Sequence, residues 1–208
     1  MFYDIDDNPT CQPLPHNPFK ACVAPRPIGW ISSLDEKGVP NLAPYSFFNA
    51  VTADPPLVMY ASNGRQPHGP KDTVGNIETT GTFVVNVATW DLRDAMNATS
   101  APVEPHVDEF ALAGLTAVPG TIVPAPRIRE CPISMECTLH QVVELPSNQE
   151  DSRNTMVIGR VVGLHIDDSV LTDGKVDMAK LRPISRLGYM DYAELGPLFT
   201  MPRPGAGD

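Results

Sequence analysis

The chain has 208 residues, enough for one domain that buries most of the surface its unfolded chain would expose. A formal net charge of -10 and a pI near 4.8 argue against nucleic acids and anionic membrane surfaces as partners. No apolar run is long enough to cross a bilayer and the first residues are acidic rather than basic, so we expect a cytoplasmic protein.

The cysteines and the motif content argue against several chemistries. Four unevenly spaced cysteines do not indicate a disulfide scaffold. Cys131 and Cys137 fall in one expected strand, where six residues separate them by roughly 20 Å, and His140 points to the opposite face. The sequence contains no His-Glu-x-x-His, Cys-x-x-Cys or Gly-x-Ser-x-Gly motif. We therefore predict neither a metal site nor acyl-transfer chemistry.

The chain divides into three parts. Prolines at positions 9, 13, 15, 18 and 25 predict that residues 1–25 form an arm with little regular structure of its own. Residues 26–204 form the expected domain, and residues 205–208 are a short tail.

The domain is expected to open with a hairpin. Residues 28–34 and 41–51 are predicted strands, joined by a turn at 35–38. Pro44 has no N–H to donate to a neighbouring strand, so the second strand should lie at a sheet edge or carry a bulge. A third strand follows at 57–61.

The middle of the chain mixes short helices with a buried strand. A loop rich in glycine and proline at 64–70 leads into an expected helix at 71–81. The β-branched run at 82–88 belongs inside a sheet. Further short helices are predicted at 91–97, with an acidic cap, and at 107–114, where a glycine ends the helix. No strand–helix–strand unit repeats.

The second half has the clearest periodicity. Most odd positions in the predicted strand 133–145 are apolar, whereas Ser134, Glu136 and most other even positions are expected to face water. A second long strand is predicted at 155–166, where Gly159 and Gly163 permit curvature. Long strands joined by hairpins, with a few helices at the margins, predict an antiparallel barrel.

The start of the 71–81 helix is a candidate anion site. Asp72 or Thr73 is the expected N-cap, and Gly81 is the expected stop. The unpaired N–H groups of a helix start, together with Lys71 and the Thr73 hydroxyl, suit a phosphate group. The alternative is an ordinary capped surface helix with a solvated lysine.

Several short motifs, in order along the chain, carry a resemblance to one known family. These motifs are Arg26-Pro27-Ile28-Gly29-Trp30-Ile31-Ser32, Asn41-Leu42-Ala43-Pro44-Tyr45-Ser46-Phe47-Phe48-Asn49, Pro55-Pro56, Lys71-Asp72-Thr73, Asn76-Ile77, Phe83-Val84-Val85-Asn86, Asp108-Glu109-Phe110, Ala113-Gly114-Leu115, Ile158-Gly159-Arg160-Val161, and Arg186-Leu187-Gly188 with Tyr192. Together they make the chain similar to the flavin reductase-like, FMN-binding split-barrel family, in the branch that includes flavoredoxins.

The resemblance implies a mainly β fold, a six-stranded antiparallel Greek-key split barrel with a few short flanking helices. It implies a homodimer with one FMN per subunit near the dimer interface. The implied cofactor-binding residues are Tyr45, Ser46, Phe47, Phe48 and Ser62 along the isoalloxazine and ribityl chain, Lys71, Asp72 and Thr73 at the phosphate, Arg65 as a further phosphate contact, and Trp30 against the flavin.

The residues themselves leave alternatives open. A tryptophan in a strand is more often a core residue than a cofactor contact, which applies to Trp30. Phe47 and Phe48 alternate faces, so one should pack in the core and the other near the ring. The chain also departs from the resemblance at two positions: Tyr189 stands where many relatives have glycine, and Asn154 where reductases serving two-component monooxygenases tend to have histidine.

Three further residues have two interpretations each. Arg186 and Tyr192 either cover the site from the C-terminal segment or attach that segment to the barrel. His106 either approaches the ring or is a solvated loop histidine.

The leading hypothesis is an NAD(P)H-dependent FMN oxidoreductase, in which NADH or NADPH is the co-substrate and the protein supplies position, electrostatics and shielding. No catalytic side chain is singled out. One alternative is a flavoredoxin-type electron carrier with little nicotinamide turnover, and another is a non-redox barrel that binds a different phosphorylated ring. A monooxygenase or another electron-accepting protein is a possible partner. The sequence has no Rossmann fingerprint that would indicate NADH or NADPH.

Overall fold

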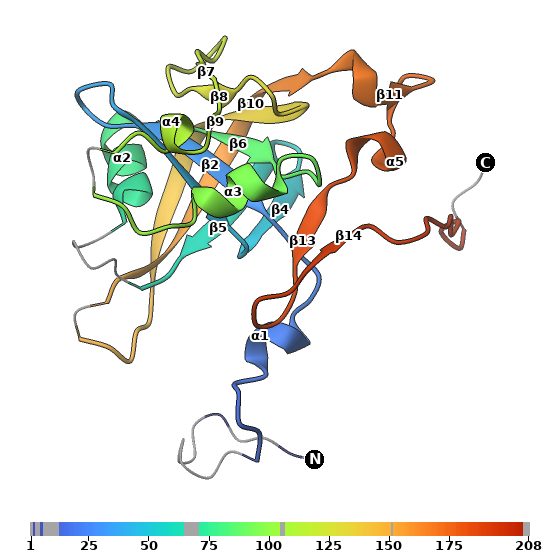
Figure 1. Cartoon of the computed structure of the whole chain (residues 1–208), viewed down its shortest axis with the longest axis horizontal. Helices are drawn as coiled ribbons and strands as arrows, with labels where there is room; N and C mark the ends of the chain where they lie inside the picture. The colour runs from blue at the N-terminus through green and yellow to red at the C-terminus, as the bar shows by residue number, and fades with distance from the viewer. Residues whose placement is uncertain are drawn as a thin grey trace.

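Seven antiparallel strands form the main sheet of the computed structural model, which describes residues 2, 5, 13–64, 71–104, 107–150 and 152–205 (Figure 1). Within those residues the strand order is β3-β2-β6-β9-β10-β5-β4. The strands are β2 (Gly29–Leu34), β3 (Pro40–Tyr45), β4 (Phe48–Ala53), β5 (Pro56–Ser62), β6 (Thr82–Val87), β9 (Ile133–Leu145) and β10 (Asn154–Ile166). The mainly β, antiparallel fold is confirmed, and β6 lies inside the sheet as expected.

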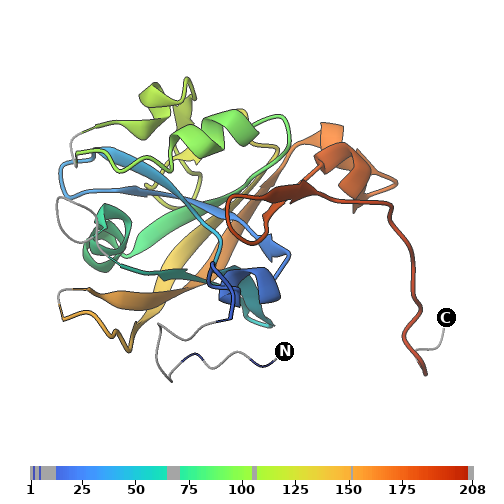
Figure 2. The same cartoon turned by 60° about the horizontal axis from the view of Figure 1, so that its bottom comes forward.

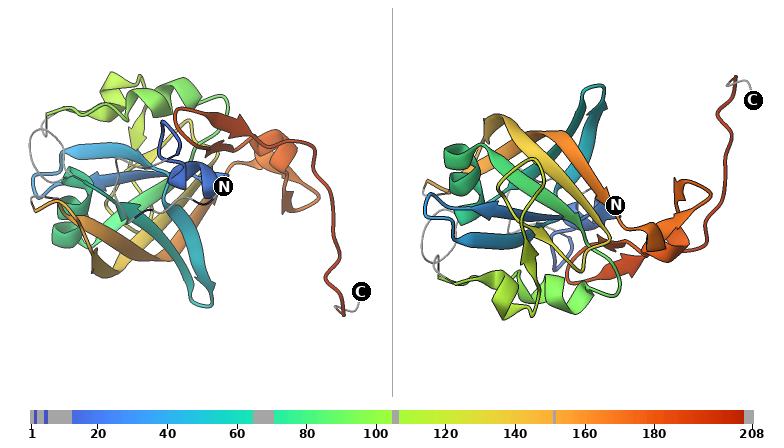
Figure 3. Two further views of the ribbon diagram at one scale, coloured as in Figure 1. Left: turned by 90° about the horizontal axis from the view of Figure 1, so that it is seen from below. Right: turned by 90° about the horizontal axis from the view of Figure 1, so that it is seen from above.

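The two edge strands of this sheet are consecutive in the chain. Only Ser46 and Phe47 separate β3 from β4, and the Ala61 N–H donates to the Phe47 carbonyl at 2.7 Å. The sheet therefore curls until its edges meet, while the β4–β5 hairpin projects beyond the barrel wall (Figure 3). The single strand predicted at 41–51 is in fact two strands, which makes the sheet seven-stranded rather than six-stranded. Pro44 lies in an edge strand, as predicted.

Glycine in β10 permits the close packing at the centre of the barrel. A Cβ at Gly159 would lie 2.3 Å from the ring of Phe83, which is fully buried on β6. The pairing of β9 with β10 shifts register next to Gly159 and again next to Gly163. The predicted curvature at these glycines is present as two irregularities in the longest strand pair.

Short helices flank the barrel. They are α1 (Phe19–Cys22), α2 (Asp72–Thr80), α3 (Arg93–Ala98), α4 (Glu109–Leu112), α5 (Met178–Leu181) and the 3-10 helix η2 (Asp168–Val170). Helix α2 buries Val74 and Ile77 in the core cluster that contains Phe83, and Gly81 ends it with φ +71°. Within the described residues no helix has both the length and the apolar character needed to span a membrane.

The helix caps differ in part from the prediction. Lys71, rather than Asp72 or Thr73, occupies the N-cap of α2 and makes no side-chain capping bond. Helix α3 begins after Leu92 and also lacks a side-chain cap, so the acidic cap expected there is wrong. In α4, by contrast, Asp108 accepts hydrogen bonds from two N–H groups of the first turn.

The even positions of β9 are less exposed than the alternation predicted. Ser134 and Glu136 are fully buried because the loop between the short strands β7 (Ala117–Val118) and β8 (Arg127–Ile128) covers that face. The Glu136 carboxylate accepts hydrogen bonds from the backbone N–H groups of Thr121, Ile122 and Val123, at 2.6–2.7 Å. The first half of the polar face of β9 is therefore an internal hydrogen-bonding face, whereas His140 and Glu144 in its second half are exposed as predicted.

Segments from the first and last parts of the domain pair beside the barrel. Strand β13 (Ile184–Arg186) pairs with β1 (Arg26–Pro27) and with β14 (Tyr192–Glu194), and a separate pair joins β11 (Leu171–Thr172) to β12 (Lys175–Val176). The buried Arg26 side chain donates to the carbonyls of Lys20, Val23 and Leu187, which ties α1 to the C-terminal segment. Beyond β14 the chain extends away from the barrel (Figure 2).

Candidate functional site

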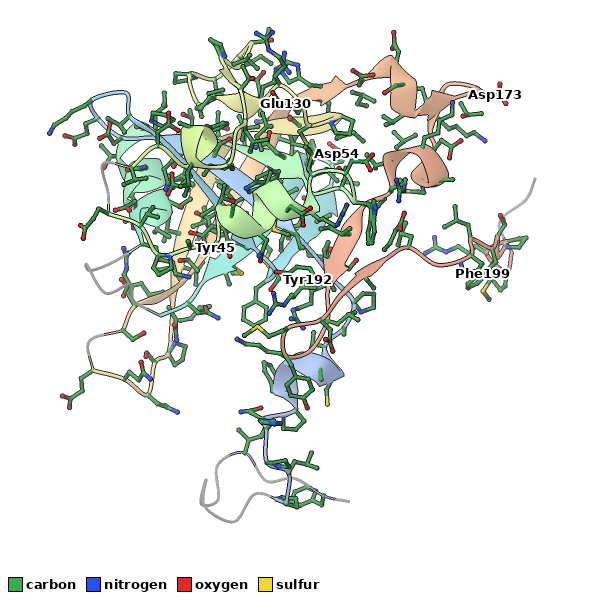
Figure 4. The ribbon with its side chains drawn as sticks, in the orientation of Figure 1. Tyr45, Asp54, Glu130, Asp173, Tyr192 and Phe199 are labelled. Carbon is green, nitrogen blue, oxygen red and sulfur yellow. The ribbon has the colours of Figure 1, made fainter. Side chains whose placement is uncertain are left out.

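A cavity of about 310 Å³ lies between edge strand β3, the start of α2 and the segment that follows α3. Tyr45, labelled in Figure 4, lies at the end of β3 within its wall. The remaining lining residues are Asn41, Ala43, Pro44, Lys71, Asp72, Thr73, Thr99, Ser100, Ala101, Pro102 and Glu109. The cavity therefore brings together Tyr45, Lys71, Asp72 and Thr73 from the predicted site.

Lys71 gives this cavity a positive end. Its Nζ lies 5.4 Å from the centroid of the Tyr45 ring, a cation–π distance. Burial lowers the pKa of Lys71, and the nearby charge of Lys20 on α1 lowers it further. Among the residues that the structure describes, Lys71 forms no ion pair with a carboxylate. A bound anion would relieve the repulsion between these two lysines.

A chain of hydrogen bonds fixes the wall between β3, α2 and α4. Glu109 accepts from the side chain of Asn41 at 2.9 Å and from the backbone N–H of Leu42 at 3.1 Å. The pKa of Glu109 is raised overall, because burial and the charge of Asp72 raise it more than the hydrogen bonds from Leu42 and Asn41 lower it. The Thr73 hydroxyl donates to Asn41 Oδ1 at 2.7 Å, so this donor already has a protein partner. Thr73 therefore offers an anion its backbone N–H rather than its hydroxyl proton.

Tyr45 is held as a neutral phenol. Burial raises its pKa to about 12, and hydrogen bonds with Thr73 and Ser62 oppose that rise only in part. Its ring packs against that of Tyr60, with centroids 4.6 Å apart. Ser62 is itself buried on β5 and is not one of the described residues that line the cavity. It contacts Tyr45, which does line it.

A second hollow of about 190 Å³ continues the first, because Pro44 and Ser100 line both. Ser46 lies here, at the break between β3 and β4. The other lining residues are Lys20, Arg26, Ile28, Met96, Arg186, Tyr189 and Tyr192. The C-terminal segment therefore closes this end of the site, as one interpretation of Arg186 and Tyr192 predicted.

The other aromatic candidates lie behind or beside these hollows. The Phe47 ring lies under the Arg26 guanidinium, 5.7 Å from its central carbon. Phe48 packs on the barrel core and against Gly29, where a Cβ would lie 2.6 Å from the ring. Trp30 is fully buried, and its indole N–H donates to the Thr99 hydroxyl at 2.9 Å. The structure thus places Trp30 in the core behind Thr99, which lines the cavity, and not in the cavity itself.

The remaining candidates are structural or undescribed. Asn154 caps the β9–β10 hairpin, accepting from the Gly64 N–H at 3.1 Å and donating to the Pro146 carbonyl at 2.9 Å. Tyr189 adopts φ +55° and lines the second hollow. Arg65 and His106 lie outside the described residues. Within the described part of the chain no cluster of metal-ligating side chains is present.

Sequence reasoning did not single out Asn41, Glu109 or Lys20 as site residues. Asn41 and Glu109 stand inside motifs that carried the resemblance. For Asn41, the available signal was an amide next to a buried apolar residue in a strand. Lys20 had no such signal, because its position depends on the way Arg26 folds the arm back onto the barrel.

The two hollows together suit one kind of ligand. One end offers a lysine and the N–H groups at the start of α2, which suit a phosphate or another anion. The adjoining stretch offers a neutral phenol, a serine hydroxyl and apolar surface, which suit a polar ring system.

The chain is similar to known proteins over most of its length. Residues 22–189 match the family model described as "Flavin reductase like domain". An uncharacterized protein of Halalkalibacterium halodurans, BH2278, is 39% identical over 183 residues, covering 88% of this chain and 87% of that protein. Among solved structures, nitrilotriacetate monooxygenase component B from Bacillus cereus has a TM-score of 0.84 and 33% identity, covering 97% of this chain and 100% of that one. The 2-nitrobenzoate 2-nitroreductase NbaA of Pseudomonas fluorescens has a TM-score of 0.78 and 28% identity, covering 91% and 90%.

Proposed function

The chain belongs to the flavin reductase-like family, a family of FMN-binding split-barrel proteins, and on that premise we propose that it reduces FMN with NADH or NADPH. The single observation that carries the proposal is the position of Lys71. It is a partly buried cation over the Tyr45 ring, with a second lysine close enough to lower its pKa. Such a site gains stability when it binds an anion such as the FMN phosphate.

The residues present fit FMN at both ends of the site. Lys71 would hold the phosphate together with N–H groups at the start of α2, where the Lys71 side chain itself makes no capping bond. Asp72 lines the same cavity, and its carboxylate would oppose an anion. Tyr45 and Ser46 would lie along the ring and ribityl chain, with Ser62 supporting Tyr45 from behind.

The protein's own part in the reaction is then positioning. Bound FMN supplies the hydride acceptor. Tyr45 is a neutral phenol at neutral pH, as any tyrosine with the ordinary pKa of 10 is, and burial moves its pKa further from neutrality, to about 12, so it adds no charge beside the ring. Tyr189 and Tyr192 restrict solvent access to the second hollow from the C-terminal side. No side chain in the two hollows is required to move a proton.

The similarity to a monooxygenase component B supports a role in a two-component system. We propose that reduced flavin is passed on to a monooxygenase or another electron-accepting protein. The homodimer and the cytoplasmic location expected from the sequence stay predictions.

The test is the visible spectrum of the purified protein during anaerobic addition of NADH or NADPH, as isolated and with FMN supplied. Bleaching of bound flavin within seconds is the expected result. A flavin that dithionite reduces and nicotinamide does not would replace this proposal with the electron-carrier hypothesis. A colourless protein unaffected by added FMN would favour a different phosphorylated ring.

A further inference from the structure

Another cavity, of about 400 Å³, lies between α3 and the β13–β14 hairpin. Tyr192, labelled in Figure 4, lies on its C-terminal wall. The other lining residues are Trp90, Arg93, Asp94, Met96, Asn97, Ile184, Arg186, Met190 and Ala193. Among the described residues, none of the cofactor-binding residues predicted from the sequence lines it, although it shares Met96, Arg186 and Tyr192 with the smaller hollow of the proposed FMN site.

Each wall of this cavity carries an arginine stacked on an aromatic ring. The Arg93 guanidinium lies 4.4 Å from the Trp90 ring centroid, and the Arg186 guanidinium lies 4.4 Å from that of Tyr192. Met96 is almost completely buried and provides an apolar floor. The cavity thus has an apolar floor, an aromatic ring and an arginine on each of two walls, and Asp94 as an acidic lining residue.

The charge of these arginines is only weakly neutralised. Arg186 donates to the Tyr189 carbonyl at 2.5 Å and to the Tyr192 hydroxyl, and among the described residues it has no carboxylate partner. Arg93 pairs at 3.6 Å with Asp94, whose side chain is 89% exposed. The neighbouring Arg182, by contrast, reaches two carboxylates. The cavity walls therefore retain positive charge that an anion can use.

We propose that this cavity binds a small planar aromatic carboxylate. Its ring would lie between the walls formed by Trp90 and Tyr192, and its carboxylate would accept from Arg93 and Arg186, whose planar forks match a carboxylate in shape. The Asn97 amide is a further donor in the wall. A volume near 400 Å³ lies within the range of small-molecule sites. The inference goes beyond the proposed function, because it requires no flavin.

Calorimetric titration of the full chain, free of FMN, tests it with 2-naphthoate and with the neutral 2-naphthamide. We expect saturable binding of one 2-naphthoate per chain, and binding of the amide at least tenfold weaker. Equal affinity for the two compounds, or no binding of the carboxylate, overturns the proposal.

Three variants locate the site. Arg93→Gln should weaken binding of 2-naphthoate about tenfold or more, and Arg93→Lys should restore part of the loss, because it restores the charge without the fork. Arg129→Gln removes an exposed arginine elsewhere and should change nothing. If Arg93→Gln is folded by circular dichroism and binds as tightly as the unaltered chain, the assignment is wrong.

Repeating the titration with saturating FMN separates this inference from the proposed function. Binding of the carboxylate without any binding of FMN overturns the proposed function alone. Binding of FMN without the carboxylate overturns the present inference alone. Loss of all carboxylate binding when FMN is added, with no effect of Arg93→Gln, would place the carboxylate in the FMN site and overturn the assignment to this cavity.

Discussion

The hydroxyl of Thr73 donates to the side chain of Asn41 at 2.7 Å, and this bond ties the first turn of α2 to edge strand β3. The same amide donates to Glu109 at 2.9 Å. One asparagine thereby connects the helix that delivers Lys71 with the strand that delivers Tyr45. The distance between the proposed phosphate contact and the proposed ring contact is set by this connection.

Lys71→Ala should weaken FMN retention. The substitution removes a charge-assisted contact of about 1.5–3 kcal/mol, which is roughly a ten- to 150-fold increase in the dissociation constant. Quenching of FMN fluorescence on binding measures this constant. Lys37→Ala, which removes an exposed lysine from the β2–β3 turn, is the matched control and should have no effect. Unchanged FMN affinity in Lys71→Ala would remove the main support for the phosphate assignment.

Asn41→Ala should destabilise the fold and loosen the site together. It leaves the Thr73 hydroxyl without its acceptor and the buried Glu109 carboxylate without one of its donors. Unsatisfied buried groups of this kind cost about 1–3 kcal/mol in the free energy of unfolding. Urea denaturation measures the loss, with the exposed Asn49→Ala as control. Equal stability of the two variants would show that the network contributes nothing.

The sequence was sufficient to predict most of the fold, because apolar alternation and turn residues are local signals. The β2–β3 hairpin, the buried β6 strand, the long β9–β10 pair and the glycine stop of α2 are all present. The break at Ser46-Phe47 was not predicted, since both halves of the segment are extended and only their partners differ. Strand pairing is set by distant residues, which a local pattern does not contain.

The part of the candidate site around Lys71 could be predicted because one short segment builds it. Lys71, Asp72 and Thr73 stand together because they open one helix. Glu136 shows the opposite case, since its environment comes from a loop that precedes it in sequence and folds over its strand. A polar side chain in an alternating strand usually faces water, and nothing local indicates that three backbone N–H groups will cover it.

Glu136 should make stability depend on pH in the acid range. Burial alone would raise its pKa, but hydrogen bonds from His165 and the backbone of residues 121–123 outweigh burial and lower the pKa to about 2, against an ordinary value of 4.5. A carboxyl whose pKa is lower in the folded state stabilises the fold fully above pH 4.5 and loses this effect as the pH falls toward 2.

The comparison is urea denaturation at pH 6 and pH 3. Between these values the native chain should lose about 2 kcal/mol more of its unfolding free energy than Glu136→Gln, which cannot titrate. At pH 6 the variant should already be less stable by about 1–3 kcal/mol, because a neutral amide accepts less well from several donors. Glu36→Gln, at an exposed position, should follow the native chain at both pH values. Parallel pH profiles for Glu136→Gln and the native chain would contradict this account.

Two glycine substitutions should change stability in opposite directions. In Gly159→Ala the added methyl group would lie 2.3 Å from the Phe83 ring, and both the ring and the strand around it are enclosed by the core. Such overpacking costs about 1–3 kcal/mol. In Gly75→Ala the methyl group meets nothing within 4 Å on the exposed face of α2, so the higher helix propensity of alanine should stabilise the protein by about 0.5–1 kcal/mol.

Thermal and urea unfolding of the two alanine variants check this difference in sign. The substitution is the same in both, so a general effect of replacing glycine cannot explain opposite results. Phe83→Leu in the Gly159→Ala background should recover part of the lost stability, because the smaller side chain vacates the space that the new methyl group needs. If Gly159→Ala is as stable as the native chain, the backbone around Gly159 can shift to make room for the methyl group. The tight contact between the Phe83 ring and Gly159 then does not set the curvature of the barrel wall.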